Sequence, residues 1–301
     1  MIESYDENVL STPYIMALRE YVFGVRKNVG LFIPKKCVSW CKWRRNCAIL
    51  CESASCDHYK NLKSYQMATK SGDEIDGYII MKPKFLILSA SGPLKVVDGV
   101  NKGSVSDLEF KLYKHDKTAF SIVNKYKFLF LDEANKPLHE IAVQFTCKGT
   151  CAMTLLQQLK LWNASVDSFC YRNNYRAERD NKYLWTFAPL LEQRMMGKSN
   201  ASAAACCFVG YEFEKDDTTK TYEKHYTGII PETMNVAKMQ RDEGRKWRKA
   251  MIAGDSLSDN VLDVFNYSDD EDDNVSPGSR KRVNAEDDCG VEAKSAKVLD
   301  F

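Results

Sequence analysis

Lys125-Tyr126-Lys127-Phe128-Leu129-Phe130-Leu131 is the stretch of sequence that decides the fold. A second apolar run, Ile141-Ala142-Val143-Gln144-Phe145-Thr146, follows the turn-forming residues 132–137. Two such runs around a turn predict a β-hairpin. Because the first run is apolar at four successive positions, its strand is expected to be buried on both faces, as in the centre of a sheet.

Outside this hairpin, the spacing of apolar residues predicts further strands and two helices. Residues 14–18 form a short apolar stretch, and strands are predicted at residues 29–33, 78–81, 85–88, 183–187 and 206–211. Met153, Leu156 and Leu159 recur at helical spacing and predict a long helix at residues 150–175, and a proline begins a second helix at 231–252. The expected fold class is α+β. It has a mostly antiparallel sheet or a partly closed, OB-like barrel, one long inserted helix, a C-terminal helix and a disordered tail.

Charge is distributed unevenly along the chain. The chain has 43 basic and 41 acidic residues. Residues 255–301 hold 5 of the basic and 13 of the acidic residues, so residues 1–254 hold 38 basic and 28 acidic residues. A basic body attracts polyanions, and an acidic tail tethered to it competes for the same surface. The predicted units are an α+β body at 1–230 with a Cys-rich basic insertion at 35–63, a basic helix at 231–252 and a disordered acidic tail at 253–301.

The sequence also bears on where the protein acts. No run approaches the ~18 apolar residues of a membrane span, and the acidic start, Met1–Glu7, does not have the pattern of a secretory signal. We therefore expect a soluble protein without membrane contact, cytoplasmic and associated with the nucleoid. If the host is eukaryotic, a nuclear location is expected, and Arg280-Lys281-Arg282 is a short candidate import cluster.

Three short segments mix cations with aromatic rings. Single-strand binding uses this chemistry, because cations follow the phosphates and exposed rings stack on bases for about 1–3 kcal/mol each. The predicted nucleic-acid-binding residues are Trp40, Lys42, Trp43, Arg44, Arg45, Tyr171, Arg172, Tyr175, Arg176, Arg245 and Lys246. The alternative is that the rings belong to the core and the Lys and Arg stems cover apolar surface.

A group of thiols and one imidazole lies in the predicted insertion. The candidate zinc ligands are Cys37, Cys41, Cys47, Cys51, Cys56 and His58. On a helix, the C-x3-C spacing places two thiols on one face, but it differs from the C-x2-C spacing of common zinc modules. Buried cysteines without a metal are the alternative to a structural zinc site, and eleven cysteines in an intracellular chain favour reduced thiols over disulfides.

Catalytic motifs are incomplete. Gly197-Lys198-Ser199 resembles the end of a phosphate-binding loop, but Glu192 occupies the position of its first glycine. His139-Glu140 lacks the second histidine of a zinc-protease helix, and the four histidines are scattered. We therefore expect a protein that is not an enzyme, while a metal-dependent nuclease built from distant acids stays open.

The chain ends on Leu299-Asp300-Phe301 after the acidic run 268–273. Leu299 and Phe301 are apolar anchors, and Asp300 with the terminal carboxylate suits a basic rim. This tail resembles those of bacterial and phage single-stranded DNA-binding proteins. The resemblance implies that these three residues dock replication or repair proteins and that the tail competes with DNA. The basic cluster at 280–282 departs from that pattern, and a merely solubilising terminus is the alternative.

A second resemblance covers most of the body. Gly30–Pro34, Gly77–Leu88, Leu138-His139 with Gln144–Gly149, and Phe208–Tyr211 resemble a recurring series in an uncharacterised domain family of cyanobacterial and mobile-element proteins. The similarity spans roughly residues 10–215 and implies one continuous domain. It implies no activity.

These observations favour a sequence-independent protein that binds single-stranded nucleic acid, with DNA as the expected polymer and a role in DNA replication. The acidic tail is expected to compete with nucleic acid and to bind partner proteins. The alternative is a non-enzymatic protein-interaction or assembly factor, stabilised by zinc if the cysteine segment binds it. The oligomeric state stays open.

Overall fold

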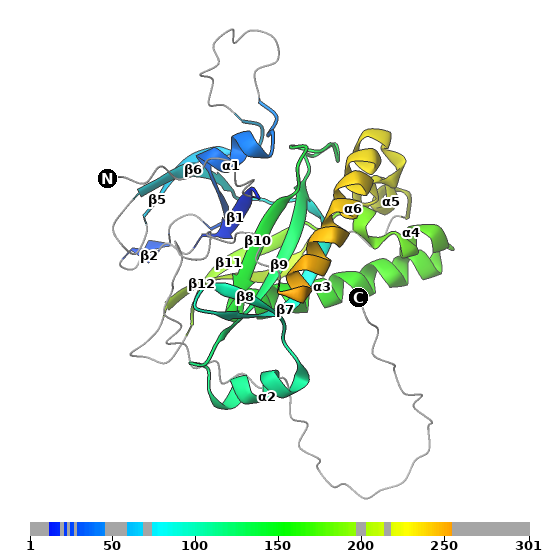
Figure 1. Ribbon diagram of the computed structural model, residues 1–301. Helices are drawn as coiled ribbons and strands as arrows, with labels where there is room; N and C mark the ends of the chain where they lie inside the picture. Colours follow the sequence, from blue (N-terminus) through cyan, green and yellow to red (C-terminus); the bar gives the residue numbers. More distant parts are fainter. Residues whose placement is uncertain are drawn as a thin grey trace, which may run out of the picture.

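A computed structural model describes residues 12–18, 21–22, 25–26, 29–45, 59–68, 74–196, 203–213 and 218–254 (Figure 1). The strands are β1 (Tyr14–Ala17), β2 (Tyr21–Val22), β3 (Val25–Arg26), β4 (Leu31–Pro34), β5 (Lys63–Ala68), β6 (Glu74–Ile80), β7 (Phe85–Val97), β8 (Val100–Ser104), β9 (Ser121–Phe130), β10 (Val143–Lys148), β11 (Pro189–Met196) and β12 (Ala203–Tyr211). The helices are α1 (Lys35–Trp40), α2 (Asp107–His115), α3 (Gly149–Arg172), α4 (Arg176–Asp180), α5 (Thr218–His225) and α6 (Pro231–Ala253), with short 3-10 turns η1 (Lys182–Leu184) and η2 (Thr227–Ile229).

Among the described residues, eight strands form one sheet in the order β5-β6-β4-β1-β10-β9-β7-β8. The predicted hairpin is confirmed, because β9 and β10 pair antiparallel with Val143 opposite Phe128 and Phe145 opposite Tyr126. As the apolar run predicted, β9 is an inner strand, between β10 and β7. The β1–β10 pair is parallel, while the other pairs of this sheet are antiparallel. The predicted mixed α+β fold with a mostly antiparallel sheet is confirmed.

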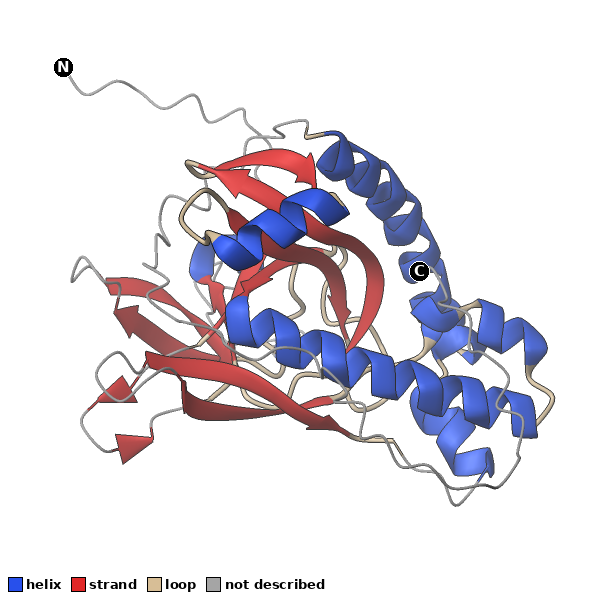
Figure 2. Cartoon of the chain, turned by 90° about the horizontal axis from the view of Figure 1, so that it is seen from below, coloured by secondary structure: helices blue, strands red, loops and turns tan. Residues whose placement is uncertain are grey.

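The two faces of the β9–β10 hairpin are covered by different helices. On one face, Tyr126, Phe128 and Phe145 enter the main core, where the Phe145 ring lies 6.2 Å from that of Phe208 in β12. Because side chains alternate along a strand, Lys125 and Lys127 point to the opposite face, which α6 covers. Figure 2 shows α3 and α6 on the two sides of the curved strands.

Helix α6 is held to the sheet by one narrow stripe of side chains. Its buried positions recur every three or four residues, which is the period of one helix face: Thr233, Ala237, Gln240, Gly244, Trp247 and Met251. Gly244 allows close approach, because a Cβ there would lie 3.0 Å from the Ser89 side chain. Polar groups tie the stripe to the sheet. Trp247 Nε1 donates to Gln144 Oε1 (3.1 Å), and Ala142 N donates to Gln240 Oε1 (2.8 Å).

Several sequence predictions need correction. The strand predicted at 183–187 is instead the turn η1 followed by two isolated bridges, at Trp185 and Phe187. The strand predicted at 85–88 is longer than expected: β7 continues to Val97, because Gly92 (φ 74°) accommodates an irregularity in the pairing with β9. The predicted alternative of a partly closed, OB-like barrel is not supported, since β5 and β8 are the two edges of the described sheet and it does not close.

None of the helices in the described parts of the chain is both long and apolar enough to span a membrane.

Candidate nucleic-acid interface

The first predicted cluster begins on the short helix α1. Cys37 and Val38 are buried and attach α1 to the core, whereas Lys36 and Trp40 lie on its outer side. These two residues are one helical turn apart, so their side chains meet. Lys36 Nζ lies 5.5 Å from the centre of the Trp40 ring, and 40% of Trp40 is exposed. Trp40 therefore presents an aromatic surface beside a cation.

Trp43, predicted to stack on bases, is a core residue instead. Only 4% of it is exposed, and its ring lies 4.8 Å from that of His139 in a stacked geometry. Its Nε1 donates to the Lys60 carbonyl (2.9 Å). The chain turns sharply between the two tryptophans at Lys42, whose φ is 56°, and this turn sends one ring outward and the other inward.

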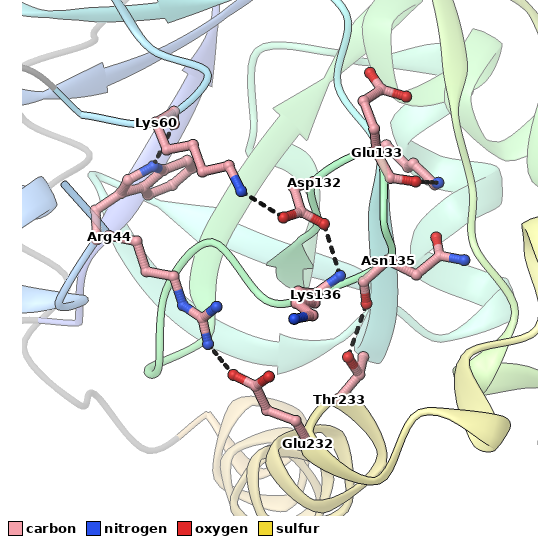
Figure 3. A network of polar contacts seen from close by, with 10 residues as sticks. Arg44, Lys60, Asp132, Glu133, Asn135, Lys136, Glu232 and Thr233 are labelled. Atoms are coloured by element: carbon pink, nitrogen blue, oxygen red, sulfur yellow. Dashed lines mark hydrogen bonds and ion pairs between the residues drawn. The ribbon is translucent and has the colours of Figure 1, made fainter. Parts of the chain in front are cut away.

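We call Lys42, Arg44, Arg45 and Lys60 the basic junction. Its cations lie where the segment after α1, the residues before β5, the β9–β10 loop and the start of α6 meet (Figure 3). Arg44 pairs with Glu232 of α6, and Lys42 Nζ lies 2.9 Å from Glu140 Oε2. Arg45 lies over the Tyr59 ring at 6.0 Å. The junction therefore gathers cations from two segments that are separated along the chain.

The loop between β9 and β10 holds the junction in place by hydrogen bonds. Asp132 accepts from Lys60 Nζ (2.6 Å) and from the Lys136 backbone N–H (2.8 Å). Burial alone would raise the pKa of Asp132, but these hydrogen bonds outweigh it and keep the pKa below its ordinary value. Thr233 Oγ1 donates to the Asn135 carbonyl (2.7 Å) and fixes the start of α6 on the same loop. The junction thus has a rigid, hydrogen-bonded base.

The pairs at the surface of the junction are weak and exchangeable. Lys42 and Glu140 are both largely exposed, and Arg44 and Glu232 are partly exposed. Such surface pairs contribute about 0–1 kcal/mol. A phosphodiester group can therefore replace Glu140 or Glu232 at little cost, while the buried Asp132 stays in place to hold the loop.

The outer face of α6 continues the basic surface from the junction. Arg44 contacts Glu232 in the first turn of α6, and the predicted Arg245 and Lys246 are exposed near its other end. The cations outside the buried stripe are Lys238, Arg241, Arg245, Lys246, Arg248 and Lys249, against the acids Glu232, Asp242 and Glu243. A helix of this length extends about 35 Å. We call the basic junction together with these cations of α6 the cationic ridge.

The third predicted cluster lies where α3 ends and α4 begins. Tyr171, Arg172, Tyr175 and Arg176 lie at the far end of α3, on the opposite side of the body from α1 (Figures 1 and 2). Tyr171 is 80% exposed. Tyr175 packs against Tyr222 with ring centres 4.6 Å apart, so it is largely a packing residue. The cluster lies nearer to α6 than to α1, because Arg241 of α6 lies 3.7 Å from the centre of the Tyr183 ring in η1, directly after α4.

The candidate zinc ligands are only partly described. Cys37 and Cys41 are buried in the core, where burial raises the pKa of Cys37 to about 11 and that of Cys41 to about 12. The Cys37 Sγ accepts from the Tyr14 N–H (3.5 Å), and the Cys41 Sγ–H donates to the Val38 carbonyl (3.5 Å). Both therefore act as neutral thiols in the described fold. Within the described ranges, no group of three or more His, Cys, Asp or Glu side chains is placed to hold a metal.

Other predicted residues lie outside the described residues. They are the remaining candidate zinc ligands, Cys47, Cys51, Cys56 and His58, and the partner-docking residues Leu299, Asp300 and Phe301. Their predicted roles remain predictions.

Sequence reasoning missed Lys36, Lys60 and the acidic partners of the junction. The spacing of Lys36 and Trp40, four residues apart on a helix, is a signal that was available in the sequence. The pairing of Arg44 with Glu232 joins residues 188 positions apart. No local pattern encodes that contact.

His139, beneath Trp43, makes the stability of the site depend on pH. Its ring accepts from the Phe130 N–H at Nε2 (2.9 Å), so Nδ1 carries the proton and donates to the Ile141 carbonyl (2.8 Å). Complete burial lowers the pKa of His139 to about 4. The unfolded chain, with an ordinary histidine pKa near 6.5, binds this proton first as the pH falls. We expect the free energy of unfolding to drop by about 2 kcal/mol between pH 7 and pH 5.

Urea unfolding at several pH values measures this loss. His139→Gln should reduce the dependence of the free energy of unfolding on pH. His115→Gln, at an exposed position of α2, should retain this dependence. Equal slopes in all three proteins would exclude His139 as the cause.

A known protein family matches most of the described part of the chain. The family described as "Domain of unknown function (DUF5895)" matches residues 10–255. A similar protein is "Uncharacterized protein 254L" of Invertebrate iridescent virus 6, which is 27% identical over 239 residues, covering 74% of this chain and 70% of the relative. No solved structure matches the chain. The expected resemblance to an uncharacterised domain family is confirmed, and the match extends past residue 215 to include α6.

Proposed function

This chain belongs to the family described as a domain of unknown function (DUF5895), and from that premise we propose that it binds single-stranded nucleic acid, DNA in the first place, without sequence preference. The observation that carries the proposal is the exposed Trp40 ring, with Lys36 over it, on the same segment as the cations of the basic junction. An exposed ring stacks on any base, and the neighbouring cations neutralise phosphates. The proposal does not require an OB-like barrel.

The cationic ridge supplies the path for the phosphate chain. A strand whose base stacks on Trp40 meets Arg44 and Arg45 next and then the outer face of α6. Because Glu140 and Glu232 are bound only by exposed ion pairs, phosphates exchange with them readily. Binding of this kind is held by many weak contacts, so it is reversible and strongly dependent on salt.

Titration with oligo-dT, followed by tryptophan fluorescence, tests the proposal. Of the five tryptophans, Trp43, Trp162, Trp185 and Trp247 are buried, so Trp40 is the ring that a base can reach. We expect quenching that weakens at higher salt. Trp40→Phe should bind but lose most of the quenching, and Trp40→Ala should bind about 5- to 150-fold more weakly, the loss of one stacked base. No quenching and no salt-dependent binding in the unaltered protein would refute the proposal.

The acidic tail is proposed to compete for the ridge and to bind replication or repair proteins. It begins at Gly254, directly after the cations at the end of α6, so its acidic residues are tethered at high effective concentration. A chain without residues 255–301 is therefore expected to bind oligo-dT more tightly and with a steeper dependence on salt. Equal affinity at low salt, with and without the tail, would rule out competition.

A protein-interaction or assembly factor is the second candidate function. It is favoured by helix α2, which exposes Leu108, Phe110 and Leu112 to solvent. A zinc-stabilised form of this candidate depends on the cysteine segment, and metal analysis of the purified protein decides it. An assembly factor without nucleic-acid binding would show no oligo-dT quenching.

A further inference from the structure

Helix α2 has an apolar face that the described parts of the chain leave uncovered. None of its side chains, all of which are described, is buried. Leu108 is 69% exposed and Leu112 is 57% exposed. Since they are four residues apart, they lie side by side on one face of the helix. Figure 1 shows α2 beyond β8, away from the other helices.

An adjacent face of α2, about 100° around the helix from the leucines, attaches it to the body. Glu109 Oε1 lies 2.8 Å from Lys95 Nζ of β7, and the Tyr113 ring lies 5.3 Å from that of Phe120. Glu109 and Ser106 also form a capping box, which fixes the start of the helix. The position of α2 is therefore defined, and Leu108 and Leu112 stay exposed beside these contacts.

Cations surround this apolar pair. Lys111 lies between the two leucines in the sequence and on the same side of the helix, and His115 follows one turn later. Lys114 and Lys117 are also exposed nearby. Of the neighbouring acids, Glu109 is engaged by Lys95, and Asp116 accepts from the Thr118 hydroxyl (2.6 Å), while Asp107 is exposed in the first turn, so the four lysine and histidine side chains still outnumber the free carboxylate. The face thus suits a ligand that carries apolar side chains together with negative charge.

The end of α6 brings the rest of the chain next to this face. Gly254 closes α6 in the left-handed conformation, and a Cβ placed on it would lie 3.1 Å from Gly103 N. Gly103 is only five residues before Leu108, a separation of at most about 18 Å. The segment from 255 to 301 has 47 residues, and a polar segment of that length has an r.m.s. span of roughly 40 Å. Its last residues therefore reach α2 without strain.

We propose that Leu299, Asp300 and Phe301 dock on the α2 face of the same chain. Leu299 and Phe301 would pack on Leu108 and Leu112, and Asp300 would pair with the lysines around them. The tether keeps this segment at an effective concentration in the millimolar range, which favours contact within one chain over contact between chains. This docking goes beyond the proposed function and holds whether or not the protein binds nucleic acid.

Carbodiimide cross-linking of the full chain, with mapping by mass spectrometry, tests the proposal. This reagent joins a lysine amine and a carboxylate that are already in contact. We expect cross-links from Lys111 or Lys114 to Asp300. Leu108→Ser/Leu112→Ser should lower their yield at least about tenfold, because both anchors are lost.

The matched control is Leu156→Ser/Leu161→Ser, which removes two exposed leucines from α3 and should leave the cross-links unchanged. Hydrogen exchange gives a second measurement: the amides of α2 should exchange faster in Leu299→Ser/Phe301→Ser than in the unaltered chain.

Two results would overturn the proposal. In a mixture of 15N-labelled and unlabelled protein, cross-links between labelled and unlabelled peptides would show that a second copy, not the same chain, occupies α2. Cross-links of the terminal residues that avoid α2, with unchanged exchange of its amides, would place the tail elsewhere. Neither result depends on nucleic-acid binding, so this proposal and the proposed function fail separately.

Discussion

Replacement of Trp247 by alanine is expected to lower the free energy of unfolding by about 3–5 kcal/mol. Trp247 is the largest side chain of the buried stripe that holds α6 to the sheet, and it packs with Leu94, Val96, Val123 and Met251 in a small separate core. Losing the indole leaves a cavity in a cluster that has few other members. The substitution also removes the hydrogen-bond donor of the Gln144 side chain. The buried Gln144 oxygen is then left unsatisfied, which lowers the free energy of unfolding further.

Urea denaturation at pH 7 measures this effect. Trp247→Phe is the matched control, since it retains most of the apolar contact and loses only the hydrogen bond to Gln144; it should cost about 1–2 kcal/mol. Oligo-dT binding by the folded fraction of Trp247→Ala should also weaken, because the cations of α6 are no longer held against the body. A loss below about 1 kcal/mol for the alanine variant would mean that α6 contributes little to the stability of the fold.

Lys42→Gln/Arg44→Gln/Arg45→Gln is expected to weaken oligo-dT binding by about 100-fold at 0.1 M salt. For single strands, each phosphate contact contributes about 0.7 to the slope of log affinity against log salt, so three lost contacts reduce the slope by about 2. The folded state should survive, because the pairs that are removed are exposed and contribute little. Affinities measured at several salt concentrations give both the loss and the slope.

A control variant distinguishes binding at the ridge from attraction by the net charge of the protein. Lys160→Gln/Arg172→Gln/Arg176→Gln removes the same number of charges from α3 and α4, away from α1. If the ridge is the binding surface, this variant keeps nearly the affinity and slope of the unaltered protein. Equal losses in both triple variants would instead indicate attraction by net charge, and the ridge would no longer be distinguished from the remaining surface.

The elements predicted correctly are those whose signal is local and periodic. The hairpin of β9 and β10, the long helix α3 and the helix from Pro231 carry strong apolar periodicity, and each lies where it was predicted. Helix α2 was missed although its start carries a capping box, Ser106 to Glu109, because its apolar residues do not form the usual buried stripe. The parallel pairing of β1 with β10 was not predictable, since no sequence pattern specifies which distant strands become neighbours.

The candidate site was predictable only in part. The mixture of rings and cations around residue 40 was visible in the sequence, but the directions of Trp40 and Trp43 depend on the turn at Lys42. Composition alone cannot distinguish these two tryptophans. The carboxylates that bind the junction come from the β9–β10 loop and from α6, so the balance of charge at the surface is a property of the tertiary fold.

The parallel pair of β1 and β10 has a consequence for synthesis of the protein on the ribosome. Tyr14 pairs with Gln144, 130 positions later. At about 5–20 residues per second, Tyr14 is made roughly 6 to 26 seconds before its partner. During that interval the edge of β1 that later pairs with β10 has no partner strand. Joining of the strands β5, β6, β4 and β1 to the rest of the sheet therefore has to wait until translation has passed β10, and an interruption of translation before that point leaves the apolar edge of β1 unpaired and prone to aggregation.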